Sequence, residues 1–385
     1  MDLLQDIIVV DLSQFLSGPS AGLRLADMGA RVIKIERPGT GDICRQLYVS
    51  NTRIGGESTI FHAINRNKES YAADLKKKDD LQRVKKLIEQ ADVVLHNFRP
   101  GVMERIGLDY ETVRGINPGI VYGEVSGYGN EGPWKDLPGQ DLLVQALSGL
   151  TWLSNNEHAQ PTPMGVSVVD ILAGTHLTQG ILAALYRRAI DGRSALVQVS
   201  MLESILDFQF EVLTCFYNDG RQLPVRSRTN NGNAYIPAPY GIYKTLDGFL
   251  SLAMGDIPKL GRLLDCPPLE EFTESSGWFD RRDAIKAILA EHLLSRTTDG
   301  WLSVLQPADI WCARVMDYED LMRQIGYKIL NMELKVKTSN GLSVRTTRCP
   351  IRIDGEMALS DKGAPLLGEH NKLIDGQFGL GIGLT

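Results

Sequence analysis

Asp170 is a candidate for covalent chemistry. It follows the apolar residues 166–169 and precedes Ile171–Tyr186, a run with helix-forming composition. An aspartate at the start of a helix commonly accepts hydrogen bonds from backbone N–H groups as an N-cap, which is a purely structural role. A carboxylate in an apolar setting can instead act as a nucleophile. Composition alone leaves both roles open.

A second candidate site lies in the turn that carries Gly18 and Gly22. The turn follows a predicted strand and opens a predicted helix, whose N-terminus would favour anions. GxGxxG spacing is missing, which disfavours a dinucleotide site, and a plain strand–helix turn is the alternative. Arg37 follows the next strand, where a phosphate or ribose partner often lies, although a solvated arginine is the common case. The run at 76–78, three lysines, fits the exposed start of a helix better than a phosphate clamp.

Other catalytic systems are poorly represented. The chain has no GxSxG, and none of its six histidines lies in an HExxH or HxH arrangement, so no metal site is predicted. His176 does not share a helix face closely with Asp170 and is expected to be structural. The five cysteines are scattered without CxxC spacing, which favours reduced thiols and a cytosolic protein.

The elements that must position these residues alternate in type over the first 125 residues. Strands are expected at 7–12, 31–36, 71–75, 92–96 and 119–126, and helices at 22–28 and 79–90. This alternation predicts an α/β fold with a mostly parallel sheet covered on both sides. Helical patterns follow from 139 to about 190, with a polar break at 154–163, and a strand is expected at 195–200.

Bulk properties are those of a globular protein. The 385 residues are 43% hydrophobic and 23% charged, and the formal charge of −6 argues against a nucleic-acid partner. No apolar run is judged long enough to cross a bilayer, and the N-terminus lacks a signal peptide, so no membrane partner is expected. A composition shift near 225 and a β-rich stretch at 240–253 suggest a second domain.

Seven segments in this order together resemble the family III CoA-transferases, and the resemblance spans nearly the whole chain. The segments are VVDLSQFLSGPSAGLRLADMGARVIKIERPGTGD, NRNKESYAADLKK, VVLHNFRPGVMERIGLDYETVRGINPGIVYGEVSGYGNEGP, GQDLLVQALSGL, GVSVVDILAGTHLTQGILAAL, APYGIYKTLDGFLSLA and APLLGEH.

The resemblance places the catalytic aspartate of the family at Asp170, which could still cap the helix as well. It implies that the Asp170 carboxylate attacks an acyl-CoA and gives an aspartyl–acyl anhydride and CoA thiolate. Acid and CoA then exchange on Asp170 through anhydride and thioester species. These remain as activated as the starting thioester, and water must be kept away from them. CoA and acyl-CoA are substrates here, and no permanently bound cofactor is expected.

The resemblance also implies the positions that contact CoA. Leu16 and Ser17 match a turn near the nucleotide that acts through its backbone, and the segment from Ala73 to Lys76 matches the adenine pocket. The other matching positions are Arg37, Asn97, Phe98, Arg99, Arg105 and Asp141.

The implied architecture is an interlocked homodimer in which each subunit is a ring threaded through the other. A large Rossmann-like, CoA-binding domain would join residues 1–200 and 325–385, a linker would span 201–224, and a smaller α+β domain would span 225–324. The partners are then a second copy of the chain, an acyl-CoA and a carboxylic acid.

Two departures from the pattern bear on the activity. The related α-methylacyl-CoA racemases carry a His-Asp pair where this chain has Gln140-Asp141, and glutamine cannot act as an acid or base. The glycine-rich loop of formyl-CoA transferase has only a loose analogue in Asn230–Asn233, which argues against an oxalate/formate pair. An acyl-CoA racemase or epimerase and a CoA-binding protein without catalysis are the alternatives. Arg226 and Arg228 could pair with the second carboxylate of a dicarboxylic substrate.

Overall fold

The computed structural model describes residues 3–47 and 51–381, and contacts divide the chain into two units. The large unit comprises residues 1–144, 167–208 and 330–385, and the middle unit comprises 145–166 and 209–329. Residues 145–166, expected in the large domain, group with the middle unit because they bond to its residues. Gln209, for example, donates to the carbonyl of Ser148. The stretch expected as a linker contains two helices, α9 (Met201–Phe208) and α10 (Phe210–Asn218).

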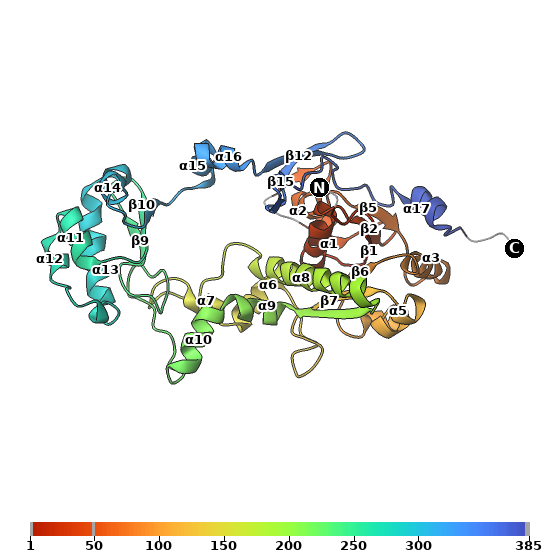
Figure 1. Cartoon of the computed structure of the whole chain (residues 1–385), viewed down its shortest axis with the longest axis horizontal. Coiled ribbons are helices and arrows are strands. Elements are labelled where there is room, and N and C mark those ends of the chain that lie inside the picture. Colours follow the sequence, from red (N-terminus) through yellow and green to blue (C-terminus); the bar gives the residue numbers. More distant parts are fainter. Residues whose placement is uncertain (1–2, 48–50, 382–385) are drawn as a thin grey trace. The chain divides into compact units, whose positions relative to one another are not determined.

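The large unit contains a six-stranded sheet with the order β5-β2-β1-β6-β7-β8, in which all neighbouring strands are parallel (Figure 1). The strands are β1 (Ile8–Asp11), β2 (Arg31–Glu36), β5 (Glu69–Ala72), β6 (Val93–His96), β7 (Val121–Ser126) and β8 (Ala195–Ser200). This confirms the predicted mixed α/β fold with a mostly parallel sheet. Strand β5 lies slightly earlier than the expected range of 71–75.

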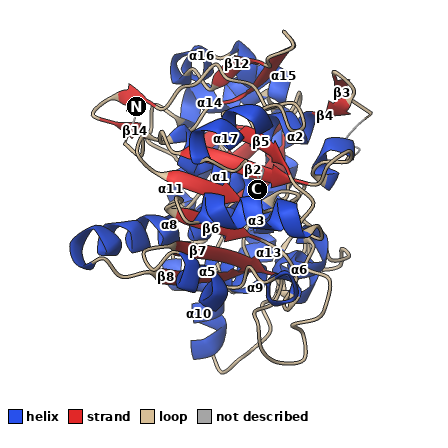
Figure 2. Cartoon of the chain, turned by 90° about the vertical axis from the view of Figure 1, so that its right-hand side faces the viewer, coloured by secondary structure: helices blue, strands red, loops and turns tan. Residues whose placement is uncertain are grey.

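The central strands are continuous apolar runs because both faces of the sheet are covered. One face carries α3 (Lys78–Ile88), α5 (Tyr110–Ile116) and α17 (Asn371–Phe378), which share a core with β1, β2, β6 and β7 and lie toward the viewer in Figure 2. The other face carries α1 (Ser17–Asp27) and α8 (Val168–Asp191), which pack on each other and on the sheet.

Helix α8 is long and apolar enough to span a bilayer by length and composition alone, which corrects the expectation that no segment was. It is packed as a core helix along part of its length, with Leu177 and Ile181 against Gly123 of β7. Close approach to α1 requires Gly174, since a Cβ there would lie 2.0 Å from the Ser20 hydroxyl oxygen. A side chain at 174 would therefore push the two helices apart.

The remaining elements of the large unit are short. They are η1 (Ile43–Gln46), β3 (Arg53–Ile54), β4 (Glu57–Ser58), α2 (Thr59–Ile64), α4 (Val102–Ile106), α9, β12 (Glu333–Lys337), β13 (Ser343–Thr347), β14 (Arg352–Ile353) and β15 (Glu356–Met357). Helices α6 (Asp141–Leu147) and α16 (Ile325–Leu330) each cross a boundary between the two units in the sequence.

The C-terminal segment returns to the outer strand of the sheet. Gly368 donates its N–H to the Ser70 hydroxyl at 2.9 Å, and the N–H of Ser70 donates to His370 Nδ1 at 3.2 Å. The side-chain amide of Asn371 accepts from the N–H of Ala72 and donates to its carbonyl, at 2.8 and 3.0 Å. The segment thus satisfies part of the free edge of β5.

The middle unit packs helices on one face of the antiparallel sheet β11-β10-β9. Strands β9 (Gly241–Lys244) and β10 (Phe249–Leu252) form the hairpin that the turn at Asp247-Gly248 predicted. The other elements are α7 (Leu150–Leu153), α10, α11 (Ile257–Leu264), α12 (Pro267–Glu270), η2 (Ser275–Gly277), α13 (Arg282–His292), η3 (Leu293–Ser295), α14 (Thr298–Leu305), β11 (Cys312–Arg314) and α15 (Tyr318–Arg323).

Candidate active site

A cavity of about 560 Å³ opens at the carboxyl ends of β1, β6 and β7 in the large unit. The strand order reverses between β1 and β6, and open parallel sheets bind ligands at such a point. Seven of the predicted site residues line this one cavity. They are Leu16, Ser17, Asn97, Phe98, Arg99, Asp141 and Asp170.

Asp170 lies in the first turn of α8. The helix begins at Val168, so Asp170 is its third residue and is not the N-cap, which corrects the expected capping role. Ser17, the first residue of α1, lines the same cavity as Asp170. Burial, followed by the negative charge of Asp141, raises the pKa of Asp170 to about 6, against the opposing effect of the polar groups of Ser17. At neutral pH this carboxylate is ionised but poorly solvated, which favours nucleophilic attack.

Asp141 performs the capping that the sequence suggested for Asp170. Its carboxylate oxygen accepts the backbone N–H groups of Val169 and Asp170 at 2.8 and 3.2 Å. These N–H groups are among those that have no partner inside a helix. Asp141 thereby holds the start of α8, and with it Asp170, at the cavity. Contact between Asp141 and CoA stays a prediction.

Asn97 fixes the turn that carries Ser17. Its side-chain oxygen accepts the N–H of Gln14 at 2.8 Å, and its Nδ2 donates to the Gln14 carbonyl at 2.7 Å and to the Ser17 hydroxyl oxygen at 3.2 Å. The turn after β6 and the turn after β1 are therefore tied together at the mouth of the cavity.

A buried ion network lies behind the same turn. Lys68 pairs with Asp11 at 2.9 Å, and Lys34 pairs with Asp42 at 2.8 Å and donates to the Ser13 carbonyl at 2.7 Å. Burial alone would raise the pKa of Asp11, but the charges of Lys68 and Lys34 outweigh it and hold that pKa below its usual value. These ion pairs and hydrogen bonds hold residues 11–17 in place.

Four predicted CoA-binding residues do not line the cavity. Arg37 and Lys76 are exposed at the β2 and β5 side of the same sheet edge, and Arg105 is exposed on α4 with its guanidinium close to Gly101. Ala73 is buried in the core formed by β1, β2 and α3, so only its backbone could face a ligand. The structure does not bring these four residues together with Asp170.

Part of the cavity wall is formed by residues that were not predicted. The additional lining residues include Gln14, Phe15, Cys44, Leu47, Ile60, Lys135 and Met201. Met201 directly follows β8. Because parallel strands end at one edge of a sheet, residues that follow each predicted strand could have been predicted to line the cavity. Lys135 lies in an irregular segment and Ile60 in the short helix α2, and no local pattern marked either as a wall residue.

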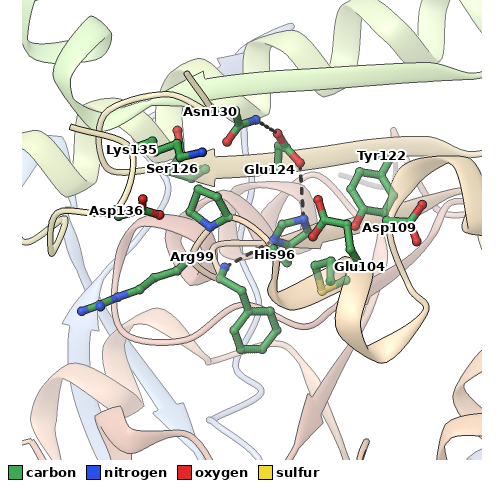
Figure 3. A pocket seen from close by; sticks show the side chains of 15 residues that line it. His96, Arg99, Glu104, Asp109, Tyr122, Glu124, Ser126, Asn130, Lys135 and Asp136 are labelled. Atoms are coloured by element: carbon green, nitrogen blue, oxygen red, sulfur yellow. Dashed lines mark hydrogen bonds and ion pairs between the residues drawn. The ribbon is translucent and has the colours of Figure 1, made fainter. Parts of the chain in front are cut away.

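A second cavity of about 360 Å³ lies beside α4 and is lined by residues that follow β6 and β7 (Figure 3). It contains the pair formed by the buried His96 and the half-buried Glu124, whose Nε2 and Oε2 atoms are 3.6 Å apart. Glu124 also accepts from Asn130 and Gln198 at 2.6 and 2.8 Å. His96 Nδ1 accepts the N–H of Phe98 at 3.3 Å, so this pair supports the turn that carries Asn97.

In the middle unit, Arg226 has a structural role. Its side chain is buried and donates to the carbonyls of Ser154, Glu157 and Ala159 at 2.7 to 3.0 Å. Three of its five N–H groups are used on these carbonyls and the side chain is buried, which argues against the expected pairing with a substrate carboxylate. Arg228 is exposed and lies 3.6 and 3.8 Å from Glu157 and Asp283. Within residues 3–47 and 51–381, no group of three His, Cys, Asp or Glu side chains could hold a metal ion.

Comparison with known proteins gives the family. A model described as CoA-transferase family III matches residues 4–371. The acetyl-CoA:oxalate CoA-transferase of Acetobacter aceti is 32% identical over 97% of this chain and 95% of its own, and the succinate–glutarate CoA-transferase of Agrobacterium fabrum is 30% identical over 96% and 94%.

Solved structures show the same similarity. A mutant of Rv3272 from Mycobacterium tuberculosis superimposes with a TM-score of 0.84 at 29% identity, covering 96% of this chain and 98% of that one. A CAIB/BAIF family protein from Brucella suis gives a TM-score of 0.83 at 28% identity, over 97% and 98%. The family match over almost the whole length, together with the aspartate in its cavity, leads to one conclusion: the chain belongs to CoA-transferase family III.

Proposed function

We propose that the protein moves CoA from an acyl-CoA thioester to a free carboxylic acid, with Asp170 as the covalent nucleophile. The observation that carries the proposal is the Asp170 carboxylate, which lines the cavity at the reversal of strand order and whose pKa is raised to about 6. Among the groups lining the cavity, it combines ionisation at neutral pH with weak solvation, as a nucleophile requires.

The proposed reaction has four steps. Asp170 attacks the thioester carbonyl and releases CoA thiolate, which leaves an aspartyl–acyl anhydride. The thiolate then attacks Cγ of Asp170, giving an aspartyl-CoA thioester and the first acid. The second acid attacks this thioester to form a new anhydride and free thiolate. Attack of the thiolate on the new acyl carbon yields the product thioester and restores the Asp170 carboxylate.

For CoA binding we infer that Leu16, Ser17, Asn97, Phe98 and Arg99 line the pantetheine path to Asp170. The cavity lining supports this part, since all five border it. Arg37, Lys76 and Arg105, with the backbone of Ala73, would hold the nucleotide end outside the cavity. Exposed cations suit phosphates, and a long extended ligand can reach from the cavity to the exposed residues.

Quaternary structure is part of the proposal. We propose the interlocked ring homodimer, with a Rossmann-like large domain, in the cytosol. Helix α8 supports an assembly because Tyr186 and Ile190 are 72% and 69% exposed on it, an apolar surface of the kind that a partner covers. Light scattering of the purified protein would show a dimer mass, whereas a monomer mass would contradict this part.

The substrates are proposed from the relatives. Proteins 28–32% identical to this chain are named for acetyl-CoA or succinyl-CoA and for oxalate, glutarate or citramalate. We therefore expect a short-chain acyl-CoA as donor and a dicarboxylic acid as acceptor, and these pairs are the first to assay.

An acyl-CoA racemase would need a proton-transferring histidine at position 140. Gln140 lines the cavity there instead, which argues against the racemase. A CoA-binding protein without catalysis would not need an aspartate with this environment.

The test is to trap the intermediate. The protein is incubated with acetyl-CoA and succinyl-CoA in turn, quenched with hydroxylamine, and mapped by mass spectrometry. A hydroxamate on Asp170 is expected, together with acid-dependent formation of the second thioester. The matched control is Asp170→Asn, which should bind CoA with unchanged affinity by calorimetry but give neither adduct nor product.

Two results would count against the proposal. Exchange of the substrate α-hydrogen with solvent deuterium, without an Asp170 adduct, would indicate the racemase. Full turnover by Asp170→Asn would remove Asp170 from the mechanism.

A further inference from the structure

The cavity beside Asp170 carries two cations. Of the described residues that line it, only Arg99 and Lys135 have a positively charged side chain, against the two carboxylates of Asp141 and Asp170. Arg99 lies in the turn after β6, and Lys135 lies in the loop after β7. Both residues also line the second cavity (Figure 3), so they stand in the wall that the two cavities share.

Neither charge is used inside the protein. Within residues 3–47 and 51–381, the side chains of Arg99 and Lys135 form no ion pair and no hydrogen bond. By contrast, Arg226 is spent on backbone carbonyls, and Lys68 is paired with Asp11. Lys135 is also exposed, so a ligand can reach its ammonium without breaking an internal pair. A free ammonium at the wall of a cavity suits an anionic ligand.

The backbone fixes where Lys135 stands. Residues 127–139 form a loop whose two ends meet at a pair of glycines, because a Cβ on Gly127 would lie 2.8 Å from the Cα of Gly139. Next to this contact, Tyr128 donates its hydroxyl to the Pro138 carbonyl at 3.3 Å. Both glycines line the larger cavity, so the loop begins and ends in its wall.

The turn that carries Lys135 is held as well. The N–H of Leu137 donates to the Trp134 carbonyl at 2.9 Å, which closes a four-residue turn with Lys135 at its second position. The Trp134 ring packs edge-on against the Tyr128 ring, with their centroids 6.5 Å apart. The Cα of Lys135 is therefore placed by the loop, and its flexible side chain extends from a fixed point.

We infer that Lys135 is a specificity-determining residue that binds the second carboxylate of a dicarboxylic acid. The inference rests on the proposed function and deepens it. In the third step, one carboxylate of the acid attacks Cγ of the aspartyl-CoA thioester, the C–S bond breaks, and CoA leaves as the thiolate. The other carboxylate takes no part in the bond changes, but it brings a negative charge into a cavity that already holds Asp141. The Lys135 ammonium offsets that charge.

The experiment compares acids of equal chain length that differ by one carboxylate. Succinate is compared with butyrate, and glutarate with valerate, each with acetyl-CoA and the full-length protein. Lys135→Met should lower kcat/KM for the two dicarboxylic acids about tenfold, the effect of one exposed charge-assisted bond. The values for the monocarboxylic acids and the KM for acetyl-CoA should stay unchanged. Lys135→Arg should keep the preference for dicarboxylic acids, and added salt should weaken that preference in the wild type.

The chain offers a matched control in Asp136. It is the next residue of the same loop and lines the second cavity, but it is not in the wall of the larger one. Asp136→Asn alters the loop at the neighbouring position and should match the wild type with all four acids. If both variants lose activity equally, the effect belongs to the loop and the Lys135 role is wrong.

The remaining outcomes are separable. If Lys135→Met raises the KM for acetyl-CoA and affects all four acids alike, the lysine binds CoA and the inference is overturned. It is also overturned if the wild type forms the Asp170 adduct but uses both kinds of acid equally or no dicarboxylic acid, and the proposed function then stands. If the wild type forms no adduct, the proposed function fails and the inference fails with it. Folding of each variant is checked by its thermal transition.

Discussion

Asp11 is buried and Asp170 is half-buried, and both carboxylates lie near the same short turn, residues 11–17, yet their pKa values move in opposite directions. Asp11 faces two lysines and is held ionised. Asp170 has no cation that lowers its pKa, and the negative charge of Asp141 adds to the effect of burial. The comparison shows that burial does not by itself make a carboxylate reactive: paired with cations it stabilises a turn, and without them it remains available to attack.

The largest expected effect is on stability, and it comes from removing a cationic partner of Asp11. Lys68→Met leaves Asp11 buried without its 2.9 Å partner. The free energy of unfolding should fall by about 3–5 kcal/mol, because an uncompensated buried charge remains. Urea denaturation measures this. Lys86→Met, at an exposed position on α3, is the control and should change the free energy by less than about 0.5 kcal/mol.

Substitution of Asp170 should change the free energy of unfolding in the opposite direction. The pKa of Asp170 is raised to about 6 from an ordinary value near 3.8, so ionising it costs stability above about pH 6 and costs nothing below about pH 4. Asp170→Asn should therefore raise the free energy of unfolding at pH 8, by an amount on the order of 2 kcal/mol. The gain should shrink through pH 6 to 4 and vanish below. A variant less stable than wild type at pH 8 would contradict the assigned environment.

The smallest expected effect is a shift in the pH dependence of activity when Asp141 is replaced. Activity should fall as pH drops through about 6, as Asp170 takes up a proton. Asp141→Asn keeps an oxygen for the N–H groups of α8 but removes the like charge. The midpoint should move to lower pH, which would raise activity at pH 5 by about two- to fivefold and leave it nearly unchanged at pH 7. An unmoved midpoint would show that burial alone sets this pKa.

Much of the large unit follows from local sequence. The apolar run Ile7–Leu12 could be assigned as a strand because burial on both faces leaves a continuous pattern. The geometry of the candidate active site was harder to predict. Asp170 was found through resemblance, while its backbone N–H is bound by Asp141, 29 positions away, and Ser17 reaches the same cavity from a third element. Such pairings depend on how α1, α6 and α8 pack, and no periodicity encodes that.

Arg226 illustrates the converse. By residue type it was a candidate for binding a carboxylate, yet its donors serve three backbone carbonyls within a loop. Whether an arginine faces a ligand or its own chain depends on burial, which a single sequence does not state.

The return of residues 368–371 to β5 has a consequence for synthesis of the chain. Every residue of the middle unit is synthesised before position 330, whereas the outer edge of the large sheet gains these partners only when residues 368–371 emerge from the ribosome. The large unit must therefore wait with an unprotected edge strand while the whole middle unit is made. Nascent chains stalled shortly before residue 368 should be the species that chaperones bind and that aggregate most readily.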